Sequence, residues 1–183
     1  NNSHNVLIQN CTFTNFVAEG VTIENSVNCS IDRCIFTIWD DYSSPVEIDT
    51  STDIIIKSCK FTWCDIGIRL WDSNNCQLRN NYFNWIDYCA IYLLYNCNNN
   101  TLENNVISFC DYGICTGGSR YYYYSTYEYL YQSPNGTLIE NNSISYSRLN
   151  GIHLTWAKNT SIFSNNITYN GGSGIYIQES FET

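Results

Sequence analysis

The chain has 183 residues, with 8 Lys and Arg against 17 Asp and Glu, which gives a formal net charge of -9 at pH 7. This charge disfavours binding to nucleic acid or to an anionic membrane surface. No apolar run reaches the length needed to span a bilayer, so we expect no membrane insertion. The length predicts a single domain over residues 1–183.

A short phrase recurs seven times along the chain, starting at an apolar residue and reaching an Asn or Cys three residues later. Successive phrases lie two dozen residues or so apart, except for one longer step whose surplus lies between Gly117 and Pro134. Such self-similarity indicates a solenoid, in which equivalent positions of neighbouring coils stack about 4.8 Å apart. The Asn or Cys of each phrase forms one such column: Cys11, Cys34, Cys59, Asn81, Asn105, Asn142 and Asn165.

Each repeat also contains a run that alternates apolar and polar residues, typical of a half-buried strand. These runs include 20–23, 45–48, 67–70, 151–154 and 174–177. Their aliphatic residues are expected to face inward, and about three short strands are expected in each coil. The residues expected to face outward form one column: Thr22, Glu47, Arg69, Tyr92, Cys115, His153 and Tyr176.

The pairs Asn80-Asn81, Asn104-Asn105 and Asn141-Asn142 each lead into a strand, and Gly-Ile-x-Leu runs recur along the chain. This pattern resembles the repeats of NosD-like and other carbohydrate-associated surface proteins, over nearly the whole chain from Asn5 to Ser180. The coils fit an all-β parallel β-helix, and the resemblance implies a right-handed one of about seven coils. The long step between Gly117 and Pro134 places a Tyr-rich insertion after the fifth coil. The resemblance implies less about function, because similar β-helices include pectate lyases, polygalacturonases, tailspikes and non-enzymatic surface modules.

Glycosylation signals point outside the cytoplasm, to an extracellular or cell-surface location. The favoured Asn-x-Ser/Thr acceptors are Asn99, Asn135, Asn141, Asn159 and Asn166. An Asn-, Ser- and Thr-rich repeat also produces such triplets by chance, so both interpretations stay open.

Three of the ten cysteines are disulfide candidates, because Cys11, Cys34 and Cys59 share one column on consecutive coils. Cys34 could bridge to either neighbour at ordinary disulfide distance. The alternative is that many of the ten are buried free thiols that pack as small hydrophobic residues.

Acidic residues form a second column: Asp40, Asp65, Asp87 and Asp111. Carboxylates stacked at the coil spacing repel one another unless a cation, a proton or hydrogen bonds intervene. The column therefore predicts either tight corners capped by Asp or a calcium site, and no other cofactor is required. In a third interpretation Asp65, Asp87 and Asp111 are catalytic. Catalysis is disfavoured because the basic groups nearby are expected to be paired, Arg148 with Asp111 and Arg69 with Glu47.

Aromatic residues form a third column: Trp63, Trp85, Phe109, Tyr146 and Tyr169. Alternation from Phe61 and Phe83 predicts that these side chains point inward and stack in the core. If they point outward instead, they form a sugar-binding platform flanked by carboxylates.

The insertion over 117–134 contains a dense group of tyrosines: Tyr121, Tyr122, Tyr123, Tyr124, Tyr127, Tyr129 and Tyr131. It predicts either a flap over the coil wall or a contact surface, and we favour the contact surface because Tyr supplies rigid area with a polar tip. The two ends of the solenoid leave little room for caps, which predicts pairing with other copies of the chain.

Together these features favour a non-enzymatic extracellular structural or surface protein, glycosylated and self-associating, even into filaments. The alternative is a polysaccharide-binding or polysaccharide-cleaving module that uses the acidic column. The expected partners are other copies of the chain and glycans.

Overall fold

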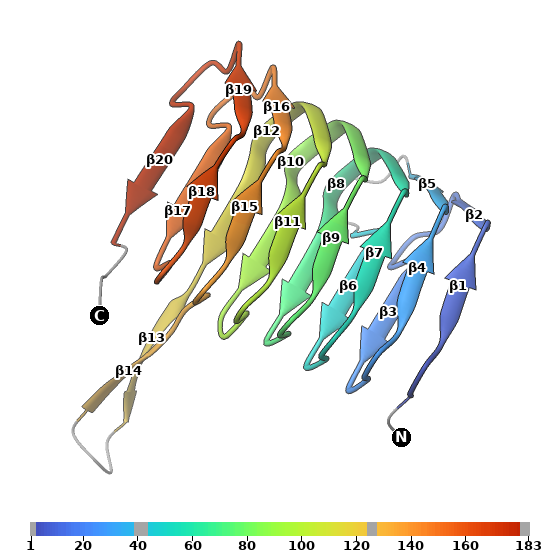
Figure 1. Ribbon diagram of the computed structural model, residues 1–183, viewed down its shortest axis with the longest axis horizontal. Coiled ribbons are helices and arrows are strands. Elements are labelled where there is room, and N and C mark those ends of the chain that lie inside the picture. The colour runs from blue at the N-terminus through green and yellow to red at the C-terminus, as the bar shows by residue number, and fades with distance from the viewer. Residues whose placement is uncertain (1–2, 39–43, 124–127, 180–183) are drawn as a thin grey trace.

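A computed structural model describes residues 3–38, 44–123 and 128–179. The chain winds into a parallel β-helix whose two ends carry the two termini (Figure 1). Seven strands, one from each coil, form the first face of the solenoid. The predicted fold class is therefore confirmed. Among the described residues, no helix is long and apolar enough to cross a membrane.

Three faces surround the core. The first face is a sheet of β1 (Leu7–Gln9), β4 (Ser30–Asp32), β7 (Ile55–Lys57), β9 (Gln77–Arg79), β11 (Thr101–Glu103), β15 (Leu138–Glu140) and β18 (Ser161–Phe163). The second face contains β2 (Thr12–Thr14), β5 (Ile35–Thr37), β16 (Ser143–Ser145) and β19 (Asn166–Thr168). The third face contains β3 (Val21–Glu24), β6 (Val46–Asp49), β17 (Ile152–Thr155) and β20 (Ile175–Gln178).

The three middle coils connect the second and third faces without a break. They do so through the long strands β8 (Lys60–Trp71), β10 (Tyr82–Leu94) and β12 (Val106–Gly117), whose first halves pair on the second face and whose second halves pair on the third. A bend inside each long strand therefore forms the corner between these two faces.

The register of the third face agrees with the predicted outward column. Glu47 pairs with Arg69, and Cys115 pairs with His153 on the next coil. Cys115 differs from the expectation in one respect, since it belongs to the outward column but is only 4% exposed.

Stacked side chains fill the interior. The rings of Phe13, Phe36, Phe61 and Phe83 form one continuous stack with centroids 4.8–5.0 Å apart. A Cβ atom at Gly67 would lie 2.5 Å from the Ala90 carbonyl oxygen and 2.7 Å from the Phe83 ring. The glycine before the Ile-x-Leu run is therefore needed where neighbouring coils approach closely.

Buried side chains also connect the coils through a ladder of hydrogen bonds. The Cys59 amide donates to Asn81 Oδ1 at 2.9 Å, and the Asn81 amide donates to Asn105 Oδ1 at 3.0 Å. Asn81 Nδ2 in turn donates to the Ile56 carbonyl at 3.0 Å. Each Asn thus satisfies backbone groups that a buried turn would otherwise leave unpaired. We call this column the asparagine ladder; its described members run from Cys34 through Cys59, Asn81, Asn105 and Asn142 to Asn165.

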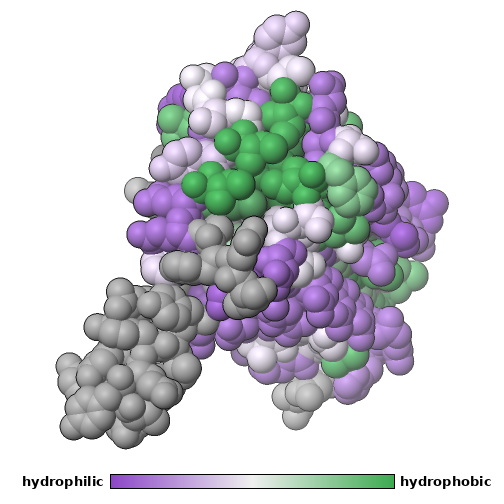
Figure 2. All heavy atoms as spheres, turned by 60° about the vertical axis from the view of Figure 1, so that its left-hand side comes forward, coloured by the Kyte–Doolittle hydropathy of each residue, from purple (hydrophilic) through white to green (hydrophobic). Residues whose placement is uncertain are grey.

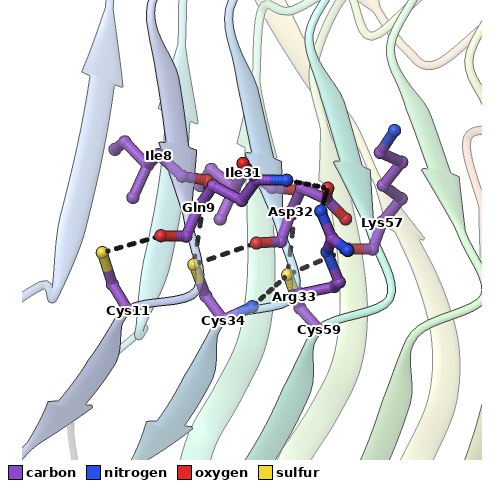
Figure 3. A network of polar contacts seen from close by, with 9 residues as sticks. All are labelled: Ile8, Gln9, Cys11, Ile31, Asp32, Arg33, Cys34, Lys57 and Cys59. Atoms are coloured by element: carbon purple, nitrogen blue, oxygen red, sulfur yellow. Dashed lines mark hydrogen bonds and ion pairs between the residues drawn. The ribbon is translucent and has the colours of Figure 1, made fainter.

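The disulfide prediction does not hold in this structure, where all ten cysteines are free thiols. Figure 3 shows Cys11, Cys34 and Cys59 side by side, each directing its sulfur toward backbone carbonyls. The Cys34 amide donates to Cys59 Sγ at 3.4 Å, the role that Asn81 Oδ1 has one coil later. The thiols therefore continue the asparagine ladder instead of pairing with one another.

The Tyr-rich insertion forms an antiparallel hairpin of β13 (Ser119–Tyr123) and β14 (Glu128–Gln132). Tyr122 lies opposite Tyr129 in its register. The hairpin extends away from the stack of coils and does not lie over it as a flap (Figure 1). Tyr124 and Tyr127 lie outside the described residues.

Candidate functional site

The corners of each coil are made by residues in the left-handed backbone region. At most corners these are residues that tolerate this conformation, such as Asn75 (φ 55°), Asn80 (φ 56°) and Asn104 (φ 55°). The corner between the second and third faces is different, because large aromatic residues occupy it on five coils. Their φ angles lie between 54° and 61°: Trp63, Trp85, Phe109, Tyr146 and Tyr169. A bulky residue with positive φ is a genuine outlier, and such outliers cluster at functional sites.

These five side chains point outward, so the prediction that they stack in the core is wrong. Their exposed fractions run from 40% for Trp63 to 76% for Tyr169. The left-handed residue turns the chain and interrupts the alternation that began at Phe61. The inward position passes to the following residue, so that Cys64 and Ile86 are each 1% exposed.

The five rings form a continuous stack across five coils, which we call the aromatic ladder. The centroid separations are 5.3 Å from Trp63 to Trp85, 4.9 Å to Phe109, 5.1 Å to Tyr146 and 5.3 Å to Tyr169. Neighbouring planes are within 13° of parallel. These separations are close to the coil spacing of about 4.8 Å, so each ring faces its neighbours along the axis of the solenoid, and the ladder is exposed along its outer side.

The acidic column lies two residues beyond the aromatic ladder in the sequence. Asp87 is exposed, and Asp65 and Asp111 are partly buried. Asp111 accepts a hydrogen bond from the Arg148 guanidinium at 2.5 Å, which confirms the predicted pair. Asp40 lies outside the described residues.

The described members of the acidic column do not form a calcium site on their own. No group of three or more His, Cys, Asp and Glu side chains within the described ranges is placed to hold a metal ion. The column distributes one carboxylate to each coil, and Arg148 already neutralises Asp111. On the third face, Arg69 is likewise bound to Glu47 at 2.6 Å, as predicted.

Several of the predicted glycosylation acceptors have a structural role in the coil, which explains why Asn occurs at these positions. Asn99, Asn141 and Asn159 are exposed corner residues with positive φ. Asn166 is exposed on β19, whereas Asn135 is partly buried. The hydroxyl that completes the Asn135 triplet belongs to Thr137, which is 1% exposed and thus inaccessible in the folded chain. The structure explains most of these asparagines by backbone geometry.

The solved structures that resemble the chain include the mannuronan C-5 epimerase AlgE4 A-module of Azotobacter vinelandii. It has 14% sequence identity and a TM-score of 0.65, and the match covers 98% of this chain and 57% of that module. This likeness supports the fold alone, and the chain spans little more than half of the module. The surface adhesin PfbA of Streptococcus pneumoniae (11% identity, 94% of this chain, 62% of that chain) has a TM-score of 0.38, too low to indicate a shared fold. Among curated proteins no sequence matches.

A family model does match, over residues 2–183, and its description is "Periplasmic copper-binding protein (NosD)". The column of thiols does not fit copper well, since Cys34 and Cys59 direct their sulfurs toward backbone carbonyls and not toward a shared point. As noted above, the described side chains also form no metal-holding group. The family match nevertheless extends over all but the first residue, and on this evidence the chain belongs to the NosD family.

Proposed function

We propose that this chain is a carbohydrate-binding β-helix that acts outside the cytoplasm and holds a polysaccharide along the aromatic ladder. The observation that carries the proposal is the placement of five stacked aromatic residues, 40–76% exposed, in a strained backbone conformation. A packing role would place such rings inside, where the Phe13 to Phe83 stack already lies.

The ladder suits an extended chain of sugar rings. Exposed aromatic rings make apolar contacts with the C–H groups of pyranose rings, and the rings here repeat once per coil. Each coil therefore offers one equivalent contact, and the contacts add along a linear polymer by raising the effective concentration of each next sugar. The periplasmic description of the family supports a location outside the cytoplasm.

The charge of the surface favours a neutral glycan. Asp65 and Asp87 flank the ladder, and the formal net charge of the chain is -9. A polyuronate would be repelled by these carboxylates. The Arg148 and Arg69 guanidinium groups, which could neutralise an acidic sugar, are bound to Asp111 and Glu47. The same pairing favours binding over cleavage, since a lyase needs cationic groups at the substrate carboxylate.

The test is a titration with linear, uncharged oligosaccharides of increasing length, followed by affinity electrophoresis in neutral polysaccharides. We expect the affinity to rise with length until the oligosaccharide spans the ladder. Trp85→Asn should weaken binding, whereas Tyr82→Ala, which removes a ring that is 38% exposed but lies off the ladder, should not. The proposal fails if neutral glycans are not retained, or if the two variants lose affinity equally.

Self-association is a second candidate, favoured by the apolar surface of the end coils. Figure 2 shows a large apolar patch at the end formed by the last coil. Ile175 and Ile177 are 44% and 61% exposed there, and at the other end Leu7 is 58% exposed. Light scattering over a range of protein concentrations, with negative-stain microscopy, tests this candidate. Ile177→Lys should reduce any assembly, and a monomer at every concentration would exclude it.

A further inference from the structure

A pocket of about 200 Å³ lies on the outer wall of the third face, apart from the aromatic ladder. It lies where β10, β12 and β17 adjoin at the base of the hairpin. The residues that give it its chemistry are Tyr88, Tyr92, Cys115, Thr116, His153 and Trp156. Its volume is below the roughly 300–1,000 Å³ of sites for drug-sized ligands, so it fits a ligand of about one ring.

Two glycines keep this space open. A Cβ atom at Gly117 would lie 2.9 Å from both the Tyr92 hydroxyl and a Leu94 methyl group. A Cβ atom at Gly118 would lie 2.7 Å from the Trp156 Cβ and 2.5 Å from the Gln132 carbonyl oxygen. The pocket thus depends on the absence of side chains at the point where the chain leaves β12 for the hairpin.

Ring contacts fix the walls of the pocket and connect them to the aromatic ladder. Tyr88 meets Tyr92 edge-on at 5.8 Å and Tyr112 at 5.6 Å, and Tyr112 meets the His153 ring at 5.0 Å. Tyr88 follows the ladder residue Trp85 on β10 by three positions. The surface between the ladder and the pocket therefore carries Tyr88 and Tyr112, each next to a carboxylate of the acidic column, Asp87 or Asp111.

The polar groups of the pocket are uncharged. Burial raises the pKa of Tyr92 and lowers that of His153, so the phenol and the imidazole are both neutral near pH 7. A neutral imidazole offers one donor and one acceptor, and within the described residues no hydrogen bond to the His153 ring is formed. The Thr116 hydroxyl is already used, since it donates to the Thr155 carbonyl at 3.1 Å and accepts from the Thr155 amide at 3.0 Å.

We propose that this pocket binds a single uncharged sugar ring, the end or a branch of the glycan that the aromatic ladder holds. Aromatic walls meet the apolar faces of the ring, and the phenol and imidazole groups meet its hydroxyls. Among the side chains that the structure describes, none that lines the pocket is charged, so they offer a uronic acid no counter-ion. This inference rests on the proposed function and adds to it a second subsite with a different geometry.

The experiment uses Cys115 as a reporter in a Cys11→Ser background, because the exposed Cys11 would consume the reagent, whereas Cys115 lines the pocket, is 4% exposed and reacts slowly enough for its rate to be followed. Alkylation of Cys115 by iodoacetamide is followed by peptide mass spectrometry, with and without glucose, galactose, mannose, N-acetylglucosamine or glucuronate. We expect at least one uncharged sugar to slow the reaction in a saturable manner, and glucuronate to have no effect.

Two variants and a control complete the test. Gly117→Ala directs a methyl group at the ends of the Tyr92 and Leu94 side chains, and His153→Phe keeps a ring but removes the donor and acceptor. Each should weaken monosaccharide binding about tenfold, equivalent to about 1.4 kcal/mol. Thr22→Ala, in the same outward column but far from the pocket, should bind as the unmodified chain does.

The outcomes separate the two proposals. If linear oligosaccharides bind the ladder but no uncharged monosaccharide protects Cys115, the pocket proposal is overturned and the proposed function stands. Unchanged monosaccharide binding by Gly117→Ala would also overturn it. If neither kind of sugar binds, both proposals fail. Loss of monosaccharide binding in Gly117→Ala with retained oligosaccharide binding would support both.

Discussion

The indole rings of Trp63 and Trp85 stack with centroids 5.3 Å apart and planes 3° from parallel, although both residues have left-handed backbone angles, with φ of 61° and 58°. This conformation costs about 1–2 kcal/mol for a residue other than glycine. An aromatic pair contributes about 0.5–1.5 kcal/mol beyond the area it buries. The stack and the strain are thus of similar size, and stability alone does not explain why indoles occupy these corners.

Replacing a ladder residue by Asn should therefore separate stability from binding. In Trp85→Asn, the backbone strain is relieved because Asn tolerates positive φ, while the contacts with Trp63 and Phe109 are lost. We expect a change in the melting temperature of no more than about 4 °C in either direction, equivalent to about 1 kcal/mol in a chain of this size. Thermal unfolding followed by circular dichroism measures this, and glycan affinity is measured on the same sample.

The matched comparison is Phe83→Ala, which removes a fully buried ring from the inner stack. It should cost about 3–5 kcal/mol. If Trp85→Asn destabilises the chain as much as Phe83→Ala does, the ladder has a packing role and the functional interpretation is wrong.

The asparagine ladder predicts a graded response at Asn105. Its Oδ1 accepts from the Asn81 amide at 3.0 Å and its Nδ2 donates to the Leu78 carbonyl at 2.8 Å. Asn105→Ala leaves both buried groups without these bonds and should cost about 2–4 kcal/mol, which lowers the melting temperature by about 5–15 °C. Asn105→Cys should cost less than half as much, because Cys59 has the same place in the ladder. Equal losses would contradict this account.

The buried thiols predict a loss of stability in alkaline solution. Burial raises the pKa of Cys59, Cys76 and Cys110 from an ordinary value of 9.0 to about 12. Because the folded chain favours the neutral thiol, this contribution is complete below pH 9 and is lost as the pH rises through the folded pKa of about 12. Melting temperatures measured in steps from pH 7 to pH 11 should fall progressively above pH 9, under reducing conditions.

Thiol labelling gives an independent check of the same feature. Below pH 9 in the folded chain, a disulfide reagent should label Cys11 at once, since Cys11 is exposed, and the nine buried cysteines slowly. Rapid labelling of several cysteines, or a mass lower by two hydrogens that reduction restores, would show that these thiols are accessible or paired.

The acidic column predicts that the surface discriminates between charged and neutral glycans. In Asp87→Asn, one exposed carboxylate beside the aromatic ladder is neutralised, so affinity for a polyuronate should rise while affinity for a neutral oligosaccharide stays within about twofold. The gain should shrink at high salt, because exposed charges are screened. Adding calcium tests the earlier metal prediction in the same assay. If Asp87→Asn weakens neutral glycan binding severalfold, the carboxylate takes part in binding directly.

The sequence was sufficient to predict the coils, their number and the register of the third face. Coil length is nearly constant, and period-two alternation then places Glu47 beside Arg69 and Cys115 beside His153. Each of these pairs can be predicted from one repeat and the repeat next to it. They hold because every coil obeys the same hydrogen-bonding pattern.

The prediction that the aromatic ladder points inward is wrong because strict alternation does not continue through a corner. Phe61 and Trp63 are two positions apart, which suggests one face, but the positive φ of Trp63 turns the chain between them. A signal is present in the sequence, since Asn15, an amino acid typical of left-handed corners, occupies the position equivalent to Trp63 on the first coil, with φ of 57°. The adjacent apolar pair Trp63-Cys64 is a second signal that the alternation restarts.

The disulfide and the pocket illustrate two other limits. The repeat pattern correctly predicts that Cys34 and Cys59 are neighbours on adjacent coils. It does not show that their sulfurs form hydrogen bonds with backbone groups. The pocket depends on how the hairpin leaves β12 at Gly117 and Gly118. That geometry arises from an insertion outside the repeat, so no comparison between repeats predicts it.

The direction of the asparagine ladder has a consequence for how such a surface changes in length. Each coil presents the same acceptor to the coil before it, so Asn105 could take the place of Asn81 opposite Cys59 if residues 81–104 were removed. The shortened chain would keep every remaining bond of the asparagine ladder and would lose one member of the aromatic ladder, Trp85, with the rest of that coil. Coils are thus interchangeable units. Duplication or loss of one coil would lengthen or shorten the binding surface, and with it the length of glycan that the chain can bind.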